Sequence, residues 1–211
     1  VSQVGASQNY NITLANGSEK GHSLVSVDYI KNDGIIKTTN FERFTTRVNN
    51  DYKLINNKLF IGENLSLSRS SQIDNNVLDP ALQALPIIPI HTVDGIGWGG
   101  PVGGMNDRQN PVRLLEDNKQ NNTINMRVFG NIFADLEIIK NLHLKTNFGL
   151  DYISTNSRNM QLTYQSGYLS NTTNSVTNYQ GSSSNWVWSN TLSYQINKNK
   201  HAFDALIGTE M

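Results

Sequence analysis

Apolar and polar residues alternate along most of the chain with a period of two. In 44–54 the even positions are mostly apolar and the odd positions polar or charged. In 59–67 the odd positions are apolar, with Glu63 as the exception. The longest run is 124–138, whose even positions read Ile, Met, Val, Gly, Ile, Ala, Leu and Ile. Alternation of this length predicts β-strands that each have one apolar face.

The same rule predicts about eight antiparallel strands and therefore an all-β fold. Their expected ranges are 7–15, 22–32, 40–54, 58–69, 123–139, 142–155, 185–196 and 200–211. Several exceed the mean globular strand of about 5–6 residues. They match the roughly 9–11 residues that a tilted strand needs to cross a bilayer, so the lengths favour a transmembrane β-barrel.

Short and long connections take turns along the chain. Short turns are expected at 16–21, 55–57, 140–141 and 197–200, with a modest loop at 32–39 and two long loops at 70–122 and 156–184. Outer-membrane barrels have this alternation, because their periplasmic turns are short and their outer loops are long. Two such long loops would be unusual in a compact soluble domain.

The composition agrees with a sheet that exposes only one face to water. Hydrophobic residues make up 37% of the 211 residues, and 30 residues are asparagine. The 17 basic and 17 acidic side chains cancel, which argues against a nucleic-acid partner. Without cysteine there is no disulfide framework. The first residues lack the features of a signal peptide, and both ends look cut from a longer chain.

Aromatic residues are expected near both ends of the strands. Tyr52 and Tyr194 fall near short turns, and a second group falls near the long loops: Phe41, Phe44, Tyr152, Trp186 and Trp188. Two aromatic girdles at the membrane interfaces would have this distribution. The alternative is that aromatic residues simply favour strands.

Eight strands could close by themselves into a small barrel, but a fragment of a larger barrel is the more economical interpretation. A set of strands cut from a larger sheet explains the ragged ends, and the polar positions are crowded with charge. We expect the following residues to face the lumen: Arg43, Arg47, Asp51, Arg127, Asn131, Asp135 and Glu137.

One family has several of these stretches in the same order. In 19–54 the matching residues are Tyr29, Gly34, Thr39, Phe41, Arg43, Arg47, Asn49 and Asp51, and further matches lie at 59–68, 108–122 and 201–211. The chain resembles the barrel of the SusC/RagA family of TonB-dependent outer-membrane transporters.

The resemblance implies a 22-stranded barrel that holds a plug domain. It implies that a TonB complex energises import of glycans or peptides, and that a SusD-like surface lipoprotein covers the outer mouth. The implied location is the outer membrane of a Gram-negative, Bacteroidetes-like cell, in contact with lipid and lipopolysaccharide. Residues 1–211 would form about a third of such a protein, from the first half of its barrel, without the plug and N-terminal domains.

Motifs for metal binding or catalysis are weak. His22, His91, His143 and His201 are scattered, without the spacing of zinc ligands. Asp74, Asn75, Asn76 and Asp79 lack the glycine and terminal glutamate of a calcium loop. No glycine-flanked nucleophile is present. We therefore expect no metal, no cofactor and no enzymatic activity.

Asp94 to Met105 reads DGIGWGGPVGGM, in which six of twelve residues are glycine. A phosphate-binding loop would need a strand before it and a helix directly after it. No strand is expected before the stretch, and no helix is expected to start before about Pro111. The stretch is better interpreted as part of a flexible outer loop that presents Trp98. The candidate ligand-binding residues are Asp94, Trp98, Asn106, Asp107, Arg108 and Asn110. The alternative is that Trp98 only anchors the loop.

Glu63 is a charged residue on a face predicted to contact lipid. Either it lies close to the periplasmic boundary, two or three residues after the 55–57 turn, or a bulge in the strand turns it away. Two other functions also stay open at this point. One is a passive porin or adhesin barrel, and the more distant one is a secreted β-sandwich that binds glycans.

Overall fold

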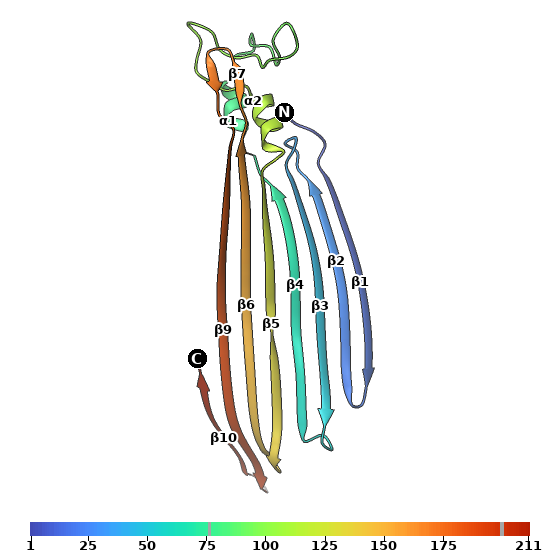
Figure 1. Cartoon of the computed structure of the whole chain (residues 1–211). Coiled ribbons are helices and arrows are strands. Elements are labelled where there is room, and N and C mark those ends of the chain that lie inside the picture. The colour runs from blue at the N-terminus through green and yellow to red at the C-terminus, as the bar shows by residue number, and fades with distance from the viewer. Residues whose placement is uncertain (76, 199–200) are drawn as a thin grey trace.

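The strands form one antiparallel sheet, in which each strand pairs with its neighbours in the sequence. The computed structural model describes residues 1–75, 77–198 and 201–211. The eight strands lie in the order β1-β2-β3-β4-β5-β6-β9-β10, as Figure 1 shows. Their bounds are β1 Ala6–Ser18, β2 Gly21–Asp33, β3 Asn40–Leu54, β4 Leu59–Ile73, β5 Asn122–Ile139, β6 Leu142–Gln161, β9 Ser175–Lys198 and β10 His201–Glu210. In the described residues β1 and β10 are the free edges, so the sheet is open, and the predicted antiparallel all-β fold is confirmed.

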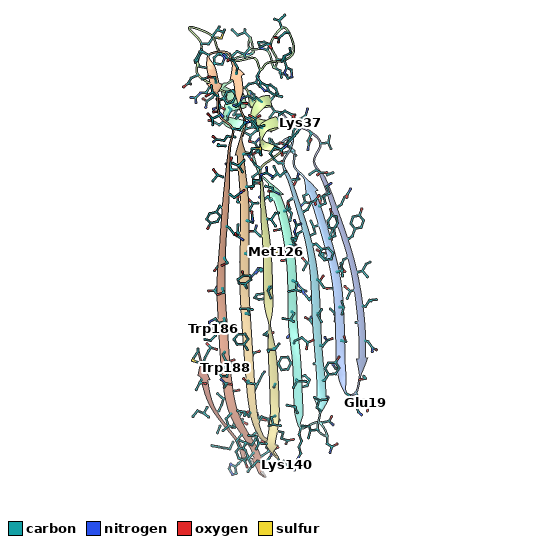
Figure 2. The ribbon with its side chains drawn as sticks, viewed as in Figure 1. Glu19, Lys37, Met126, Lys140, Trp186 and Trp188 are labelled. Carbon is teal, nitrogen blue, oxygen red and sulfur yellow. The ribbon has the colours of Figure 1, made fainter. Side chains whose placement is uncertain are left out.

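Short turns lie together at one end of the sheet, which we call the turn end. Glu19 and Lys140 mark this end in Figure 2. Ile55, Asn56 and Asn57 adopt positive φ angles of 52°, 54° and 68°, and Asn141 adopts 69°. Asparagine tolerates this left-handed conformation better than most residues, which explains its use in these turns. Lys200, at the predicted start of the last strand, lies outside the described residues.

The opposite end carries a cap, formed by residues 74–121 (except 76) and 162–174. It contains α1 (Leu78–Gln83), α2 (Pro111–Asn118), and a small hairpin of β7 (Tyr164–Ser166) and β8 (Leu169–Asn171). Figure 1 shows the cap above the ends of β4, β5, β6 and β9. The sequence does not predict α1, whereas α2 begins at Pro111, where a helix start becomes possible. Neither helix of the described chain is long and apolar enough to span a bilayer.

The loop predicted over 156–184 is shorter in the structure, where it spans only 162–174. β6 continues to Gln161 and β9 begins at Ser175, with Gln161 paired to Ser175. This part of both strands is rich in Ser, Thr and Asn on both faces, so no alternation reveals it. Strand pairing here depends on backbone hydrogen bonds, which these side chains do not prevent.

The sheet separates apolar from polar side chains but has no core of its own. Register places Val48, Leu65 and Leu150 on one face, and Asn49, Asn64 and Asn131 on the other. Leu14 on the apolar face remains 71% exposed and Ile132 55% exposed. In the described residues, the only buried hydrophobic side chains are Val77 and Leu115, which both lie in the cap. The apolar face of the sheet is therefore left bare.

Glu63 is the fifth residue of β4 and remains on the apolar face. The β3–β4 and β4–β5 pairings run through it without a register shift, so the bulge hypothesis is wrong. It also lies further from the turn than expected. Asn50 donates a hydrogen bond to Glu63 and accepts one from Ser23. These three residues form a row of hydrogen-bonded polar side chains across β2, β3 and β4. The Glu63 carboxylate therefore has a hydrogen-bond partner on the apolar face.

Two tryptophans predicted near the long-loop end of their strand lie in the middle of it. Because β9 extends over 24 residues, Trp186 and Trp188 lie in its middle (Figure 2). Tyr152 is likewise central in β6. Phe41 and Phe44 lie near the cap end of their strand, β3, so the five residues do not share one end of the strands, and the second girdle stays a prediction. Tyr52 and Tyr194 do lie near the turn end.

Candidate functional site

Segments far apart in the sequence are joined in the cap through Ser166. Its hydroxyl donates to the carbonyl oxygen of Gly99 at 2.8 Å, and the residue is fully buried. A side chain at Gly100 would collide with the backbone of Ser166. The glycines at 99 and 100 thus permit close backbone packing, while Gly95 and Gly104 adopt positive φ angles of 73° and 86°.

Asp94 and Trp98 belong to one tight turn. Asp94 accepts hydrogen bonds from the Thr92 hydroxyl and from the backbone N–H of Ile96. These bonds, that from Thr92 first, lower the pKa of the Asp94 carboxyl below 3.8. Trp98 is half-buried and stacks on His91 at 4.8 Å between ring centroids. These contacts agree with Trp98 anchoring the loop.

Asn110 is the N-cap of α2. Its side-chain oxygen accepts from the backbone N–H groups of Val112 (3.0 Å) and Arg113 (3.3 Å). Its amide donates to the carbonyl oxygens of Ile90 and Gly99, both at 2.9 Å. Since Asn110 is only 6% exposed, its hydrogen-bonding capacity is used within the cap.

Of the other three predicted ligand residues, only Asn106 is hydrogen-bonded to α1, at its last residue, Gln83. Asn106 donates to the carbonyl oxygen of Gln83 at 3.0 Å and its own carbonyl accepts from the Tyr168 hydroxyl. Asp107 and Arg108 form an exposed pair at 3.9 Å. No hydrogen bond among the described residues joins the six candidates into one cluster, and their role in binding stays a prediction.

Charged residues predicted to face the lumen do share one face of the sheet. Arg43, Arg47 and Arg127 line a groove of about 670 Å³. Arg127 forms a bidentate ion pair with Asp151, in which Nε and Nη2 donate to the two carboxylate oxygens at 2.7 and 2.8 Å. This planar guanidinium–carboxylate geometry is the strongest form of such a pair.

The same face continues toward the turn end as a chain of amides and ion pairs. Asn131 accepts from Asn64 at 3.2 Å and donates to Asn147 at 2.6 Å. Asp51 contacts His22 at 3.0 Å, and Asp135 contacts His143 at 2.8 Å. A second groove of about 550 Å³ lies over Asn131 and Asp135. The face is thus mainly polar, with Phe60, Phe129 and Phe133 among the polar side chains, and it offers hydrogen-bonding groups along much of its length.

Histidines and acids do not converge on a metal site in the described chain. His22 and His143 each contact one aspartate, and His91 stacks on Trp98. In the weak calcium motif, the backbone carbonyl of Asp74 accepts from Asn118 and its carboxylate from Gln72. Asn76 of that motif lies outside the described residues.

A cleft beside α2 was missed by sequence reasoning. It has a volume of about 510 Å³ and contains Arg113, Tyr164, Asn159 and Gln161 among its lining residues. Pro111 signals the helix, and Asn159 and Gln161 continue the polar parity of β6. The sequence does not predict the cleft, because its walls come from three separate segments that meet only in the folded chain.

Solved structures share this fold. The chain is similar to chains of the RagAB peptide importer in its closed-closed state, with 20% identity and a TM-score of 0.66, over 96% of this chain and 24% of that one. A structure of the RagAB peptide transporter gives 21% identity and a TM-score of 0.70, over 97% and 24%. No model of a protein family matches the chain.

Curated relatives add sequence similarity. TonB-dependent receptor P26 of Formosa agariphila is 28% identical over 196 residues, which is 89% of this chain and 19% of the relative. TonB-dependent receptor P3 of the same organism is 26% identical over 167 residues, or 72% and 16%. The chain is homologous to part of a TonB-dependent receptor. This likeness fits a SusC/RagA fragment, as the sequence predicts.

The chain spans about a fifth of the length of these receptors, so the expected third is wrong. TonB-dependent receptors lie in the outer membrane. They are transporters rather than enzymes, in agreement with the prediction that this chain has no enzymatic role. Its open sheet corresponds to about a quarter of the RagA barrel chain.

Proposed function

We propose that this chain forms part of the barrel wall of a TonB-dependent importer of glycans or peptides in the outer membrane. The apolar face contacts lipid, and the polar face contacts the plug and the solute in the lumen. The turn end faces the periplasm, and the cap lies over the outer mouth.

The observation that carries the proposal is the bare apolar face of the sheet. Ile132, Phe148 and Trp188 follow one another across β5, β6 and β9 and are 55%, 39% and 43% exposed. Burying apolar area contributes roughly 25 cal/mol per Å², so a face this size needs a cover. Lipid covers it without a second layer of protein, and the backbone groups between neighbouring strands are already paired.

The cap and the wall suit the partners of such an importer. A SusD-like surface lipoprotein would meet the cap, since RagAB is a complex that includes a partner of this type. The TonB complex would act on a plug inside the barrel. Arg43 and Arg47 would face that plug from the wall.

Two alternatives are less well supported. A β-sandwich needs two packed sheets, whereas the described chain has a single large sheet and a two-stranded hairpin. A passive porin or adhesin would have a similar wall, but the sequence similarity is to TonB-dependent receptors.

Spin labels can test which face meets lipid. In the full-length receptor in lipid vesicles, labels at Val128 and Ile132 should be accessible to oxygen and shielded from an aqueous nickel quencher. Labels at Asn131 and Asp135 should show the reverse preference. Equal accessibility on both faces would exclude the proposed wall.

A transport assay separates an importer from a passive pore. Uptake of the receptor's solute should stop when the TonB gene is deleted, while the receptor remains folded in the outer membrane. Uptake that persists at the same rate would favour the porin alternative.

A further inference from the structure

Three successive rows of side chains cross the apolar face of the sheet from β1 to β4, near its cap end. Each row consists of residues that lie directly opposite one another on neighbouring strands. The row nearest the cap is polar and reads Gln8, Lys31, Glu42 and Ser71. The next, which we call the aromatic row, reads Tyr10, Tyr29, Phe44 and Arg69. The third is mostly aliphatic and reads Ile12, Val27, Thr46 and Leu67.

The order of these rows is that of a membrane interface. Over roughly 14 Å of strand the side chains change from charged and polar, through aromatic, to aliphatic. The rings of Tyr10 and Tyr29 stack with their centroids 6.4 Å apart, and Tyr10 and Phe44 are exposed. Tyrosine favours the headgroup level of a bilayer, because its ring is apolar and its hydroxyl is polar. The aromatic row therefore marks the boundary between headgroups and hydrocarbon on this part of the sheet.

Arg69 is the charged member of the aromatic row. Its side chain is exposed and lies between Phe44 of β3 and Met126 of β5 in the register of the sheet. Within the described chain it makes no side-chain hydrogen bond and no ion pair. The carboxylate of Glu42, one row nearer the cap, pairs with Lys31 at 3.7 Å. The N–H donors of the Arg69 guanidinium are thus available to a ligand.

Glu63, further toward the turn end of the same strand and on the same face, provides a contrast. Its carboxylate accepts a hydrogen bond from Asn50, which in turn accepts one from Ser23. A charge on a lipid-facing surface costs free energy that falls toward the interface, where a long side chain reaches the headgroups. Glu63 is partnered by the protein, whereas Arg69 lies at the interface and is left for a partner from the membrane.

The chemistry around Arg69 suits a phosphorylated lipid. A guanidinium is always charged, and its planar fork of donors matches two oxygens of one phosphate. Toward the turn end, Leu67 and Val128 continue the face as an aliphatic surface on which acyl chains can lie. Toward the cap, Lys31 and Ser71 give a polar surface for the rest of the headgroup. Phosphate and acyl chains are therefore accommodated in the order in which a lipid presents them.

We propose that Arg69 binds a phosphate of the lipid A part of lipopolysaccharide. The choice of leaflet rests on the proposed function, in which the cap end of the sheet faces the outside of the cell. In the outer leaflet of a Gram-negative outer membrane, the phosphates at this depth belong to lipid A, whereas glycerophospholipids occupy the inner leaflet. The contact fixes the depth of β4 in the outer leaflet.

Photocrosslinking in the full-length receptor tests this proposal. A photoreactive residue replaces Met126, which lies next to Arg69 in the register and is labelled in Figure 2. The purified receptor is irradiated in micelles that contain phosphorylated lipid A, and the product is detected with an antibody against lipid A. Arg69→Gln should lower the yield roughly tenfold, because a charge-assisted bidentate contact is lost.

Two further variants separate the contact from general effects of charge and folding. Arg69→Lys should give an intermediate yield, because an ammonium keeps the charge but not the two parallel hydrogen bonds. Lys58→Gln, in the turn at the other end of the sheet, removes one positive charge and should leave the yield unchanged. The heat-modified gel mobility of each variant shows that its barrel is folded.

The lipid is varied in the same way. Lipid A whose phosphates have been removed should crosslink as weakly to the unaltered receptor as phosphorylated lipid A does to Arg69→Gln. Equal yields for the two lipids, or for the receptor with and without Arg69, would overturn the proposal. Capture of phosphatidylglycerol in preference to lipid A would also overturn it. None of these results changes the spin-label contrast between Ile132 and Asn131, so failure of this site and failure of the proposed function can be told apart.

Discussion

β6 contains two kinds of strand in one continuous element. From Leu142 to Ile153 apolar and polar residues alternate, whereas from Ser154 to Gln161 polar residues predominate on both faces. Pairing with β9 continues without a break through both parts. The backbone ladder therefore sets where the strand runs, and the side chains set only what each face can contact.

The eight-stranded sheet, which we call the wall, and the cap also differ in which contacts stabilise them. The wall buries almost nothing by itself, while the cap has its own small core at Val77 and Leu115. In the proposed barrel, the stability of the wall would come from the surrounding lipid and from the remaining strands. The cap is held by specific hydrogen bonds such as those of Asn110 and Ser166. Substitutions should consequently act through different causes in the two regions.

The largest effect is expected for a charge placed on the apolar face of the wall. Ile132→Arg should destabilise the folded receptor by about 2–4 kcal/mol if the residue lies near the middle of the bilayer. Asn131→Arg, on the adjacent polar position, should have a small effect. Urea titration in lipid vesicles, read by the heat-modified gel mobility of the folded barrel, measures both. Equal losses would remove the distinction between the faces.

A smaller and local effect is expected in the cap for Asn110→Ala. Loss of the N-cap should cost roughly 0.5–2 kcal/mol, because the first N–H groups of α2 lose their acceptor. Hydrogen exchange of residues 112–115 should accelerate, with no change in the wall. Asn106→Ala removes the side-chain bonds to the carbonyl of Gln83 and from the backbone N–H of Arg108 and serves as the matched control. A protected α2 in the Asn110 variant would contradict this view of the cap.

A still smaller effect is expected for the Arg127–Asp151 pair on the polar face. The two side chains are 46% and 27% exposed, so solvent screens their attraction despite the good geometry. A double-mutant cycle with Arg127→Gln and Asp151→Asn should give only the weak coupling of a solvent-exposed ion pair. A strong coupling would mean that this face is much drier in the full receptor than the sheet alone implies.

The smallest effect concerns the pH dependence of the turn at Asp94. Because its folded pKa is lowered below 3.8, the carboxylate stabilises the turn fully above pH 3.8, and this contribution is lost as the pH falls through the folded pKa. Hydrogen exchange of residues 92–97, corrected for its intrinsic pH dependence, should show loosening only in that acid range. Asp94→Asn should abolish the pH dependence. A turn that loosens identically in both proteins would assign the effect to another group.

Prediction from the sequence succeeded where alternation was strong. β3 matches its predicted range of 40–54, because the lipid-compatible face leaves a period-two signal in its residues. It failed for the polar part of β9, which begins ten residues earlier than expected. There the strand is maintained by its neighbour, and its own side chains carry no periodic signal.

The sequence by itself determined the order of the strands, the short turns at one end and the two faces of the sheet, because these depend on local periodicity and turn chemistry. Only the tertiary structure decided that Ser166 packs against Gly99 and Gly100, and that Asn50 and Ser23 partner Glu63. It also decided that Arg113 and Tyr164 meet in the cleft beside α2 and the cap end of β6. These contacts join residues distant in sequence, so no local pattern encodes them, and the register of the sheet and the folding of the cap bring them together.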